Sequence, residues 1–443
     1  MKITYLNPGQ PGRDLVYPSV YMVDLLNSLG FELVDEGESD LILVTMSDPD
    51  SFSSLRAIRN RNQNAKIIVG GFEAYAGEWM LAFADYVVAG KGERFLLTLA
   101  RTREIPVDLP EVYSLATVYW RACVPYEGTP VEDFPVITVG EKSMYGVAGF
   151  GCKSKCAFCL TSWVQPHRDA SESHVKRMAN YAEASDKRIT FVTNDYDLFK
   201  YGRAVNAQSV MVRDILSDED AFLKMLAESR RGMLHIGVEG FLEKTRRKLA
   251  KPLKAEQLRR VLDMIGYSNF DVEVFFISGI PGDGQIEDIE DMFPMGTTRS
   301  PRIFLKFTTL NPAPHTPLWT TPLDSIGELT DEDVLEWYKR FCMKRNPRLR
   351  TFAVRTPARE LWRSVLRRCD PEQVFKIPLM PKANTPVAEF LDDVVACGLE
   401  NTIDVTGREL PNSHIISPLR GVLNKAIEKW NHPAAVLREV RFE

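Results

Sequence analysis

The sequence lacks any apolar run long enough to cross a membrane, since a spanning helix needs ~20 consecutive apolar residues. Its start, Met-Lys-Ile-Thr-Tyr-Leu-Asn-Pro, is a short apolar run that stops at Pro8. It therefore lacks the longer apolar core and the small-residue cleavage site of a signal peptide. We expect a cytoplasmic protein without a membrane partner.

The chain also lacks an excess of one charge, internal repeats and low-complexity tracts. Its formal net charge is −5 over 443 residues, of which 44% are hydrophobic and 26% charged. This is the composition of an ordinary soluble protein. The length allows two or three domains, each with a hydrophobic core of its own.

Cysteine is sparse, yet three of the seven cysteines fall within eight residues, as Cys152, Cys156 and Cys159. This C-x₃-C-x₂-C spacing favours a ligand set, and thiolates suit iron–sulfur clusters and zinc. A structural zinc site takes a fourth Cys or His, and an ordinary [4Fe–4S] electron carrier uses four cysteines. Three thiolates on a four-iron cluster would leave one iron open to a substrate or cofactor.

One alternative for the cysteines stays open at this point. A zinc loop could be completed by a distant ligand, for which His167 and His174 are the candidates. A disulfide is less consistent with the sequence, because the local cysteine count is odd and no secretory signal precedes it.

Residues 1–105 alternate apolar strands with helices. The strands are expected at residues 2–6, 40–45, 65–69 and 86–89, and the helices near residues 19–29, 53–60 and 78–84 and from residue 93 onward. Near-continuous apolar strands of this kind form a parallel sheet covered on both faces. We predict a small Rossmann-like (flavodoxin-like) domain, followed by a proline-spaced linker over residues 106–140.

Residues 141–320 contain six further strand-like runs that alternate with helices. The runs cover residues 144–148, 188–193, 209–212, 233–238, 272–278 and 303–310. The alternation predicts an open, parallel (β/α)₆ barrel whose site lies at the carboxyl ends of its strands. The cysteine loop follows the first of these strands.

The cysteine spacing, Phe158 before the last cysteine and the glycine-rich approach to the loop resemble the radical S-adenosylmethionine (SAM) superfamily. The resemblance implies a [4Fe–4S] cluster on Cys152, Cys156 and Cys159, with SAM bound at its open iron. Reductive cleavage of SAM would yield a 5′-deoxyadenosyl radical that abstracts hydrogen from a substrate. The electron would come from an external flavodoxin-like or ferredoxin-like donor.

The same resemblance implies SAM contacts that follow the barrel strands in order. They are Phe158 in the loop, Asn194, Asp195 and Asp197 after the second strand, Arg213 after the third, Glu239 after the fourth, and Gly279 and Ile280 after the fifth. A cationic amine suits a carboxylate such as Asp195, and the methionyl carboxylate suits the fork of Arg213. Taken singly, the aspartates could be turn residues and Arg213 a surface charge. No catalytic residue is assigned.

The N-terminal domain resembles the cobalamin-binding domain found ahead of many radical SAM cores. Gly70, Gly71, Gly90 and Gly92 follow its strands, where a large cofactor could approach. The cobalt-ligating histidine of the usual Asp-x-His-x-x-Gly loop is absent, since no histidine precedes His167. Either a corrinoid binds without a protein imidazole, or the domain binds something else or only packs.

Residues 321–443 predict an α-rich region with a helix over residues 328–344 that Thr330 caps. Between Lys339 and Arg368 the sequence holds eleven Lys or Arg and one acid. Such a basic block predicts a phosphate, nucleotide or DNA surface. The alternative is a solvated helix face, paired with acids elsewhere, that is formed by Arg359, Arg363 and Arg367.

Three functions follow from these features. The first is hydrogen abstraction that leads to isomerisation or rearrangement of a modified nucleobase in DNA. The basic block and the degenerate cobalamin-like domain resemble bacteriophage radical SAM isomerases of modified thymidines. The second is cobalamin-dependent methyl transfer. The third, from a different class, is a non-catalytic corrinoid- or metal-binding sensor.

Overall fold

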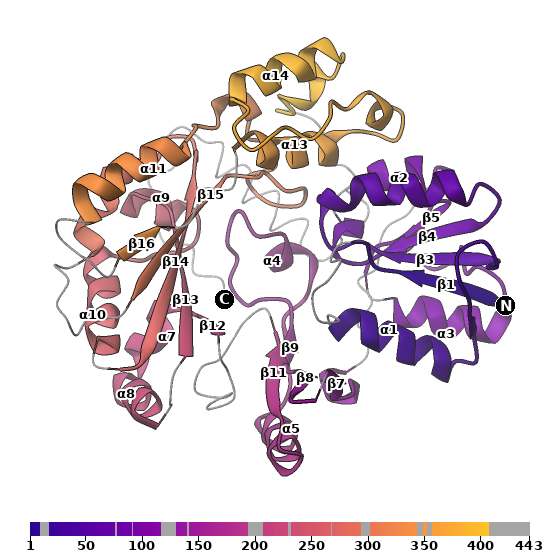
Figure 1. Ribbon diagram of the computed structural model, residues 1–443, viewed down its shortest axis with the longest axis horizontal. Coiled ribbons are helices and arrows are strands. Elements are labelled where there is room, and N and C mark those ends of the chain that lie inside the picture. Colours follow the sequence, from indigo (N-terminus) through magenta and orange to yellow (C-terminus); the bar gives the residue numbers. More distant parts are fainter. Residues whose placement is uncertain are drawn as a thin grey trace.

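Parallel sheets flanked by helices make up most of the computed structural model (Figure 1). The structure describes residues 1–8, 17–75, 78–90, 92–116, 130–139, 141–193, 207–228, 232–266, 268–293, 302–342, 349–351 and 357–406. Within these ranges, no helix has the length and apolar character needed to span a membrane.

The N-terminal region is a doubly wound sheet. In its described part six strands run in the order β2-β1-β3-β4-β5-β6, all parallel except the antiparallel edge strand β6. The first five follow the flavodoxin-like strand order, which confirms the predicted fold class. The strands are β1 (Lys2–Leu6), β2 (Glu32–Leu33), β3 (Leu41–Thr45), β4 (Lys66–Gly70), β5 (Tyr86–Val88) and β6 (Val112–Tyr113).

Helices cover both faces of this sheet. Figure 1 shows α2 (Phe52–Arg61) on one face and α1 (Tyr17–Ser28) and α3 (Glu93–Thr102) on the other. Three features depart from the sequence prediction. The helix expected near residues 78–84 is a 3₁₀ helix over Glu78–Ala82. The edge strands β2 and β6 were not expected, because strands of two residues carry no periodic signal.

The central region holds the six predicted barrel strands, divided between two sheets. Among the described residues, one sheet has the order β11-β8-β7 and the other β12-β13-β14-β15-β16. All neighbours are parallel except β7 with β8. The strands are β7 (Ile137–Val139), β8 (Ser143–Val147), β11 (Arg188–Val192), β12 (Ala207–Val210), β13 (Gly232–Glu239), β14 (Phe270–Ser278), β15 (Ile303–Thr309) and β16 (Leu349–Thr351).

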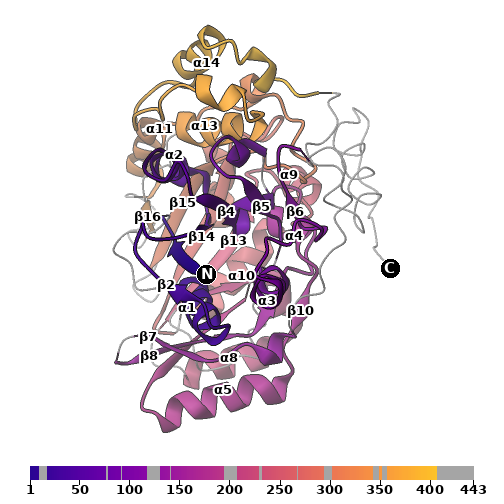
Figure 2. The same ribbon diagram turned by 90° about the vertical axis from the view of Figure 1, so that its right-hand side faces the viewer.

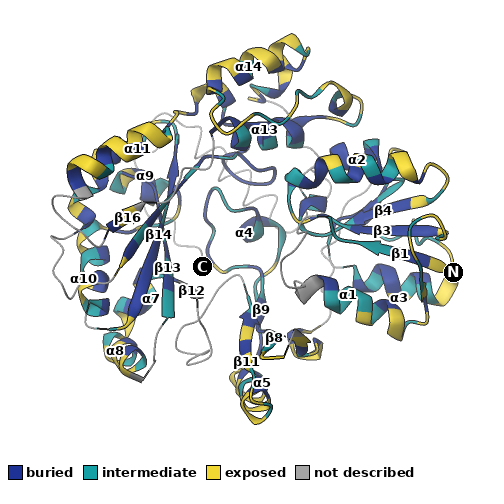
Figure 3. Cartoon of the chain, viewed as in Figure 1, coloured by how far each residue is buried: buried dark blue, intermediate teal, exposed yellow. Residues whose placement is uncertain are grey.

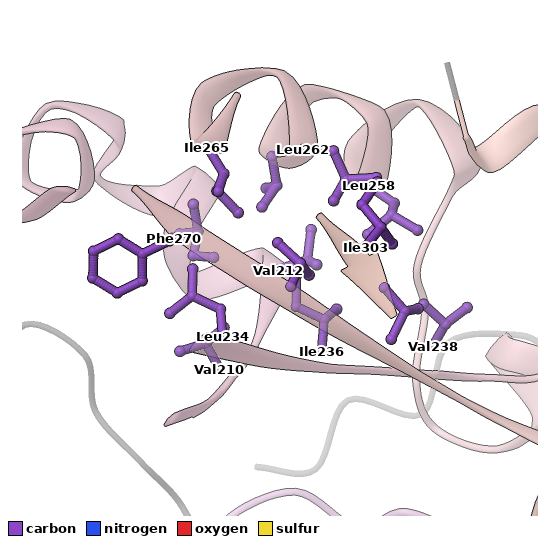
Figure 4. Packing of buried hydrophobic residues seen from close by; sticks show 14 of the residues in the cluster. Val210, Val212, Leu234, Ile236, Val238, Leu258, Leu262, Ile265, Phe270 and Ile303 are labelled. Carbon is purple, nitrogen blue, oxygen red and sulfur yellow. The ribbon is translucent and has the colours of Figure 1, made fainter. Parts of the chain in front are cut away.

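Apolar residues at every second position of the strands form the sheet face that the helices cover. In Figure 4, Leu234, Ile236 and Val238 of β13 lie in the same packed cluster as apolar side chains of the neighbouring helix. Each of these three side chains is at most 1% exposed. Because successive strand residues point to opposite faces, the residues between them belong to the face that points away from these helices. Figure 3 shows the strands largely buried, with exposed residues on the outer sides of the helices.

The remaining helices have mostly the predicted positions. Ser171 caps the helix that follows the cysteine loop, accepting from the amide of His174 at 3.4 Å. Thr330 and Asp333 form a capping box, but the helix they open is shorter than expected and continues as a π-helical turn over Tyr338–Cys342. The helices are α4 (Leu160–Val164), α5 (Glu172–Ala184), α7 (Val212–Ser217), α8 (Glu219–Glu228), α9 (Glu243–Lys248), α10 (Ala255–Ile265), α11 (Asp331–Trp337), α13 (Pro357–Arg368) and α14 (Val387–Ala396).

Helix α13 packs on the carboxyl end of the N-terminal sheet, and Figure 2 shows it above that sheet. Arg363 Nε lies 2.8 Å from Asp50 Oδ1, and Arg359 Nη2 lies 2.9 Å from Asp50 Oδ2. Arg367 makes two bonds of 2.9 Å to the fully buried carboxylate of Glu73. Burial raises the pKa of Asp50, but its arginine partners outweigh this effect and hold that pKa below its ordinary value.

These contacts give the acidic partners of three arginines in the basic block between Lys339 and Arg368. Arg359, Arg363 and Arg367 pair with acids elsewhere in the chain, as the alternative interpretation proposed, although Arg363 and Arg367 are largely buried rather than solvated. Arg368 is also buried, and its guanidinium donates to the carbonyl oxygens of four residues, namely Trp319, Thr321, Thr402 and Ile403. These four arginines hold the C-terminal region in place.

Replacing Arg367 by methionine removes the partner of a carboxylate that is 0% exposed. We expect the free energy of unfolding to fall by about 3–5 kcal/mol, because Glu73 keeps its desolvation cost and loses its compensating charge. Urea unfolding followed by circular dichroism measures this loss. Arg340→Met is the matched control, since Arg340 pairs with Glu287 on the surface, and it should cost less than about 1 kcal/mol. Equal losses in the two variants would contradict the buried bridge.

Candidate functional site

The cysteine loop leaves the carboxyl end of β8 and is closed by a short antiparallel pair. β9 (Gly149–Phe150) pairs with β10 (Arg168–Asp169), so the two ends of the loop meet. Gly151 has a φ of +64°, and a Cβ there would lie 2.5 Å from the carbonyl oxygens of Gln165 and Pro166. Only glycine fits both the conformation and the close approach. Gly151 therefore fixes the turn into the first cysteine.

None of the three loop cysteines is in a disulfide; Cys156 is buried, and Cys152 and Cys159 are half-buried. The carbonyl of Cys156 accepts from the amide of Cys159 at 3.2 Å and from Trp163 Nε1 at 2.9 Å. These two bonds fold the loop around the middle cysteine. The absence of a disulfide among them agrees with a ligand set.

The donor chemistry of the loop fits an iron–sulfur cluster. Burial raises the pKa of Cys156 to about 12, which the charge of Lys251 opposes and the neighbouring thiols and Glu239 reinforce. A thiol of this kind stays protonated until a metal takes the place of its proton. Thiolates are the ligands that iron takes in such clusters, and the three on this loop would hold three irons of a four-iron cluster.

The two candidate zinc ligands have other neighbours. His167 Nε2 lies 3.4 Å from Asp169 Oδ1, and His174 Nδ1 lies 3.2 Å from Arg177 Nη2 on α5. Over the part of the chain that the structure describes, no three His, Cys, Asp or Glu side chains gather closely enough to hold a single metal ion. A four-iron cluster makes a different demand, since each thiolate binds a different iron.

A buried ion pair lies beside the cysteine loop. Glu239 ends β13 at a register shift, with a φ of +73° that non-glycine residues rarely adopt. Lys251 Nζ lies 3.4 Å from Glu239 Oε1, and the two side chains are only 15% and 11% exposed. Strained residues that the surrounding structure holds in place cluster at functional sites. This pair is therefore a candidate for contact with a ligand.

Lys251 is a site residue that the sequence did not reveal. Burial lowers the pKa of Lys251, but the carboxylate of Glu239 outweighs this effect and holds it above its ordinary value, so the ammonium is charged. The backbone near Lys251 also contacts the loop, because Ala157 N donates to Leu249 O at 3.1 Å. A lysine after a short helix looks like a surface residue, and only its burial distinguishes it.

We compared the chain with known proteins. No protein-family model matches it, and no curated protein does. The solved radical SAM methyltransferase TsrM from Kitasatospora setae, with cobalamin and a [4Fe-4S] cluster bound, matches over 73% of this chain and 78% of its own, at 14% identity and a TM-score of 0.50. The cobalamin-dependent SAM radical enzyme OxsB, with aqua-cobalamin bound, matches over 97% of this chain and 66% of its own, at 13% identity and a TM-score of 0.50. The chain has the fold of cobalamin-dependent radical SAM enzymes.

The radical SAM fold brings several predicted SAM contacts to one end of the barrel. Arg213, on α7, reaches the cysteine loop, with Nη2 3.4 Å from Ser154 Oγ. Glu239 faces Lys251 as described above. Ile280 is buried in the same apolar cluster as Ala157 of the loop, and Phe158 packs against that cluster.

The two remaining groups of predicted SAM contacts are Gly279 and the three polar residues that follow β11. Gly279 has a φ of +77°, and a Cβ there would lie 2.3 Å from Gly327 O. The backbone conformation and the close packing therefore both require glycine at this position. Asn194, Asp195 and Asp197 lie outside the described residues, and their predicted contact with the amine of SAM stays a prediction.

The N-terminal glycines were expected to mark an approach for a large cofactor. Gly71 has a φ of +96°, and a Cβ there would lie 2.6 Å from Met46 O, so the packing of two loops already requires glycine at this position. The carboxyl ends of β3 and β4 lead to Asp50 and Glu73, which are engaged by α13. This part of the radical SAM fold offers no imidazole for cobalt, because no histidine precedes His167.

Each loop cysteine should be essential for cluster assembly. After anaerobic reconstitution, we expect Cys152→Ala, Cys156→Ala and Cys159→Ala to lose most of the bound iron and sulfide and the broad visible absorbance. Cys369→Ala is the matched control, because Cys369 is a buried free cysteine outside the loop. Full iron and sulfide content in any of the three loop variants would contradict the assigned ligand set.

Proposed function

We propose that this protein is a radical SAM enzyme. The observation that carries the proposal is the enclosed loop with three free thiols at the carboxyl end of β8. Two further features support it, namely the buried Lys251–Glu239 pair beside the loop and the reach of Arg213 to Ser154. A sensor that only binds metal has no need of charged groups arranged around an open coordination position.

In this proposal Cys152, Cys156 and Cys159 hold a [4Fe–4S] cluster and leave one iron for SAM. The chemistry that these groups supply when bound is one-electron cleavage of SAM to methionine and a 5′-deoxyadenosyl radical. An external flavodoxin-like or ferredoxin-like protein is the proposed electron donor.

The chain's own residues contribute charge, position and exclusion of water. Lys251 provides a fixed positive charge for the carboxylate of SAM, and Glu239 provides the negative charge that keeps this ammonium in place. Arg213 is half exposed and beside the loop, and so is available as a second cation. Trp163 and Ala157, at most 4% exposed, close the loop against solvent.

Lys251→Met should weaken SAM binding by about tenfold or more, since a hydrogen bond to a charged group contributes roughly 1.5–3 kcal/mol. Equilibrium binding of SAM to the reconstituted protein, measured by calorimetry, gives the affinity, and iron content shows that the cluster is intact. Lys254→Met is the matched control, because Lys254 is three residues away and half exposed. An unchanged SAM affinity in Lys251→Met would remove this residue from the site.

The outcome of the radical step has two candidates. The likeness to TsrM, whose structure is that of a methyltransferase with cobalamin bound, supports methyl transfer. The missing cobalt-ligating histidine and the contacts of α13 with the N-terminal sheet support isomerisation without cobalamin. We propose methyl transfer first, because the likeness to OxsB, a cobalamin-dependent enzyme, covers 97% of this chain and so includes its N-terminal region. DNA as a partner stays a prediction, to which Arg359, Arg363 and Arg367 do not contribute while they are paired.

The mass of the product separates these outcomes. The reconstituted protein is incubated anaerobically with SAM, reductant and DNA or nucleosides, with and without cobalamin, and the products are analysed by mass spectrometry. Methyl transfer adds one methylene unit and depends on cobalamin, whereas isomerisation leaves the mass unchanged. Failure to form either methionine with 5′-deoxyadenosine or a methylated product would favour the non-catalytic sensor.

A further inference from the structure

The face of the five-stranded sheet that points away from the described helices carries polar residues among apolar ones. Val272 and Val274 of β14 and Leu305 of β15 are 0% exposed in the helix-covered core. By alternation, Glu273 and Lys306 project from the opposite face. Figure 1 shows α10 and α11 on one side of this sheet and α4, which follows the cysteine loop, on the other. The polar face is thus turned toward the side of the cysteine loop.

Four side chains from three adjacent strands meet on this face. His235 of β13 is the register partner of Glu273 of β14, and its Nε2 lies 3.3 Å from Glu273 Oε2. Lys306 Nζ of β15 lies 2.6 Å from Glu273 Oε1. The ring of Phe275 lies beside both, 5.4 Å from Lys306 Nζ and 5.7 Å from the imidazole centre. We call these four residues the lumen cluster.

The lumen cluster holds charges of both signs, and two of its members are partly exposed. Glu273 compensates Lys306, and burial, the largest influence, holds the pKa of His235 below its ordinary value, so the imidazole is neutral at pH 7. The next carboxylate along β14, Asp271, is likewise paired, with Arg302. The side chains of Lys306 and His235 are 38% and 28% exposed. A ligand therefore meets the partly exposed groups of Lys306 and His235 first, and the Glu273 carboxylate, whose side chain is 8% exposed, behind them.

The lumen cluster lies next to the Glu239–Lys251 pair along β13. A Cβ on Gly237 would lie 2.1 Å from Glu239 Oε1 and 3.0 Å from Lys251 Nζ, so both groups lie over Gly237. His235 is two residues away on the same face, about 6–7 Å along the strand. Gly237, without a side chain, is the only residue of this face of β13 between them. A ligand on the lumen cluster would thus lie beside the proposed SAM site.

We propose that the lumen cluster binds the substrate by the N–H and C=O edge of an uncharged planar lactam, and this inference rests on the proposed radical SAM function. Lys306 donates to the carbonyl oxygen and Glu273 accepts from the N–H. The ring of Phe275 offers a face for planar stacking. His235 donates to Glu273 from Nε2 and positions its carboxylate.

The arrangement selects against other ligand classes. A donor and an acceptor side by side match an amide whose N–H and C=O point the same way, as in a lactam, and not a trans peptide, where they point apart. An anion is repelled by Glu273 and a cation by Lys306, so neither gains from a balanced pair. A carboxylate has about four acceptor positions, of which Lys306 and His235 take two. Room to accept from a ligand therefore remains.

The test uses small probes on the wild-type protein without iron or SAM. The probes are 2-pyridone, which carries the lactam edge, N-methyl-2-pyridone, which lacks the donor, and benzoate, which is an anion. Saturation-transfer NMR titrations should show 2-pyridone binding about tenfold or more tightly than the other two. Equal binding of 2-pyridone and N-methyl-2-pyridone, or preference for benzoate, would overturn the proposal.

Variants locate the binding on the chain. Lys306→Met and Glu273→Gln should each weaken 2-pyridone binding about tenfold, with thermal unfolding as the check on folding. Glu219→Gln is the matched control, because it removes a carboxylate paired with Arg260 on the helical side, and it should leave binding and SAM cleavage unchanged. If folded Lys306→Met binds 2-pyridone like wild type, the lumen cluster is only structural. SAM cleavage is measured without a probe, so that failure of this inference and failure of the radical SAM function give different results.

Discussion

The cysteine loop is enclosed by three separate parts of the chain, and the rest of the structure is arranged around that enclosure. One buried apolar cluster contains Trp79 of the N-terminal region, Ala157 of the loop, Ile277 and Leu310 at the barrel end, and Trp362 of α13. The loop cannot be placed by the barrel alone, because its covering side chains come from elements hundreds of residues apart. This shared packing keeps water from the thiol of Cys156, and the low polarity raises the pKa of that thiol. A cluster that is sensitive to solvent and oxygen needs such a cover.

Where the N-terminal sheet, the cysteine loop and α13 meet, the buried charged side chains are found in ion pairs. Each carboxylate drawn into this junction is met by a cation, as in Glu73 with Arg367 and Glu239 with Lys251, because an unpaired buried charge is far too costly. The first pair joins α13 to the N-terminal sheet, and the second stands beside the thiols. The edge of the sheet that binds ligands in flavodoxin-like domains is therefore partly used for packing here. This gives a physical reason why the domain can persist without a cobalt-ligating histidine.

The sequence predicted most of the longer regular elements. Barrel strands such as β11 and β14 were predicted to within two residues because near-continuous apolar runs bounded by turn residues have a strong local signal. The contacts between distant residues were not predictable. Nothing near Arg367 in the sequence indicates Glu73, and Lys251 looks like any surface lysine. The pairing of His235 with Glu273 and Lys306 depends on the register of three strands, which is set by packing rather than by spacing along the chain.

The central claim is that three thiolates hold a four-iron cluster whose fourth iron is open to SAM. Mössbauer spectroscopy of the protein reconstituted with isotopically enriched iron, recorded with and without SAM, tests it most directly. The account predicts that SAM changes the signal of one iron of the cluster and leaves the others nearly unchanged. A cluster in which the signal of every iron is unchanged by SAM, or a loop that binds zinc and no iron, would contradict it.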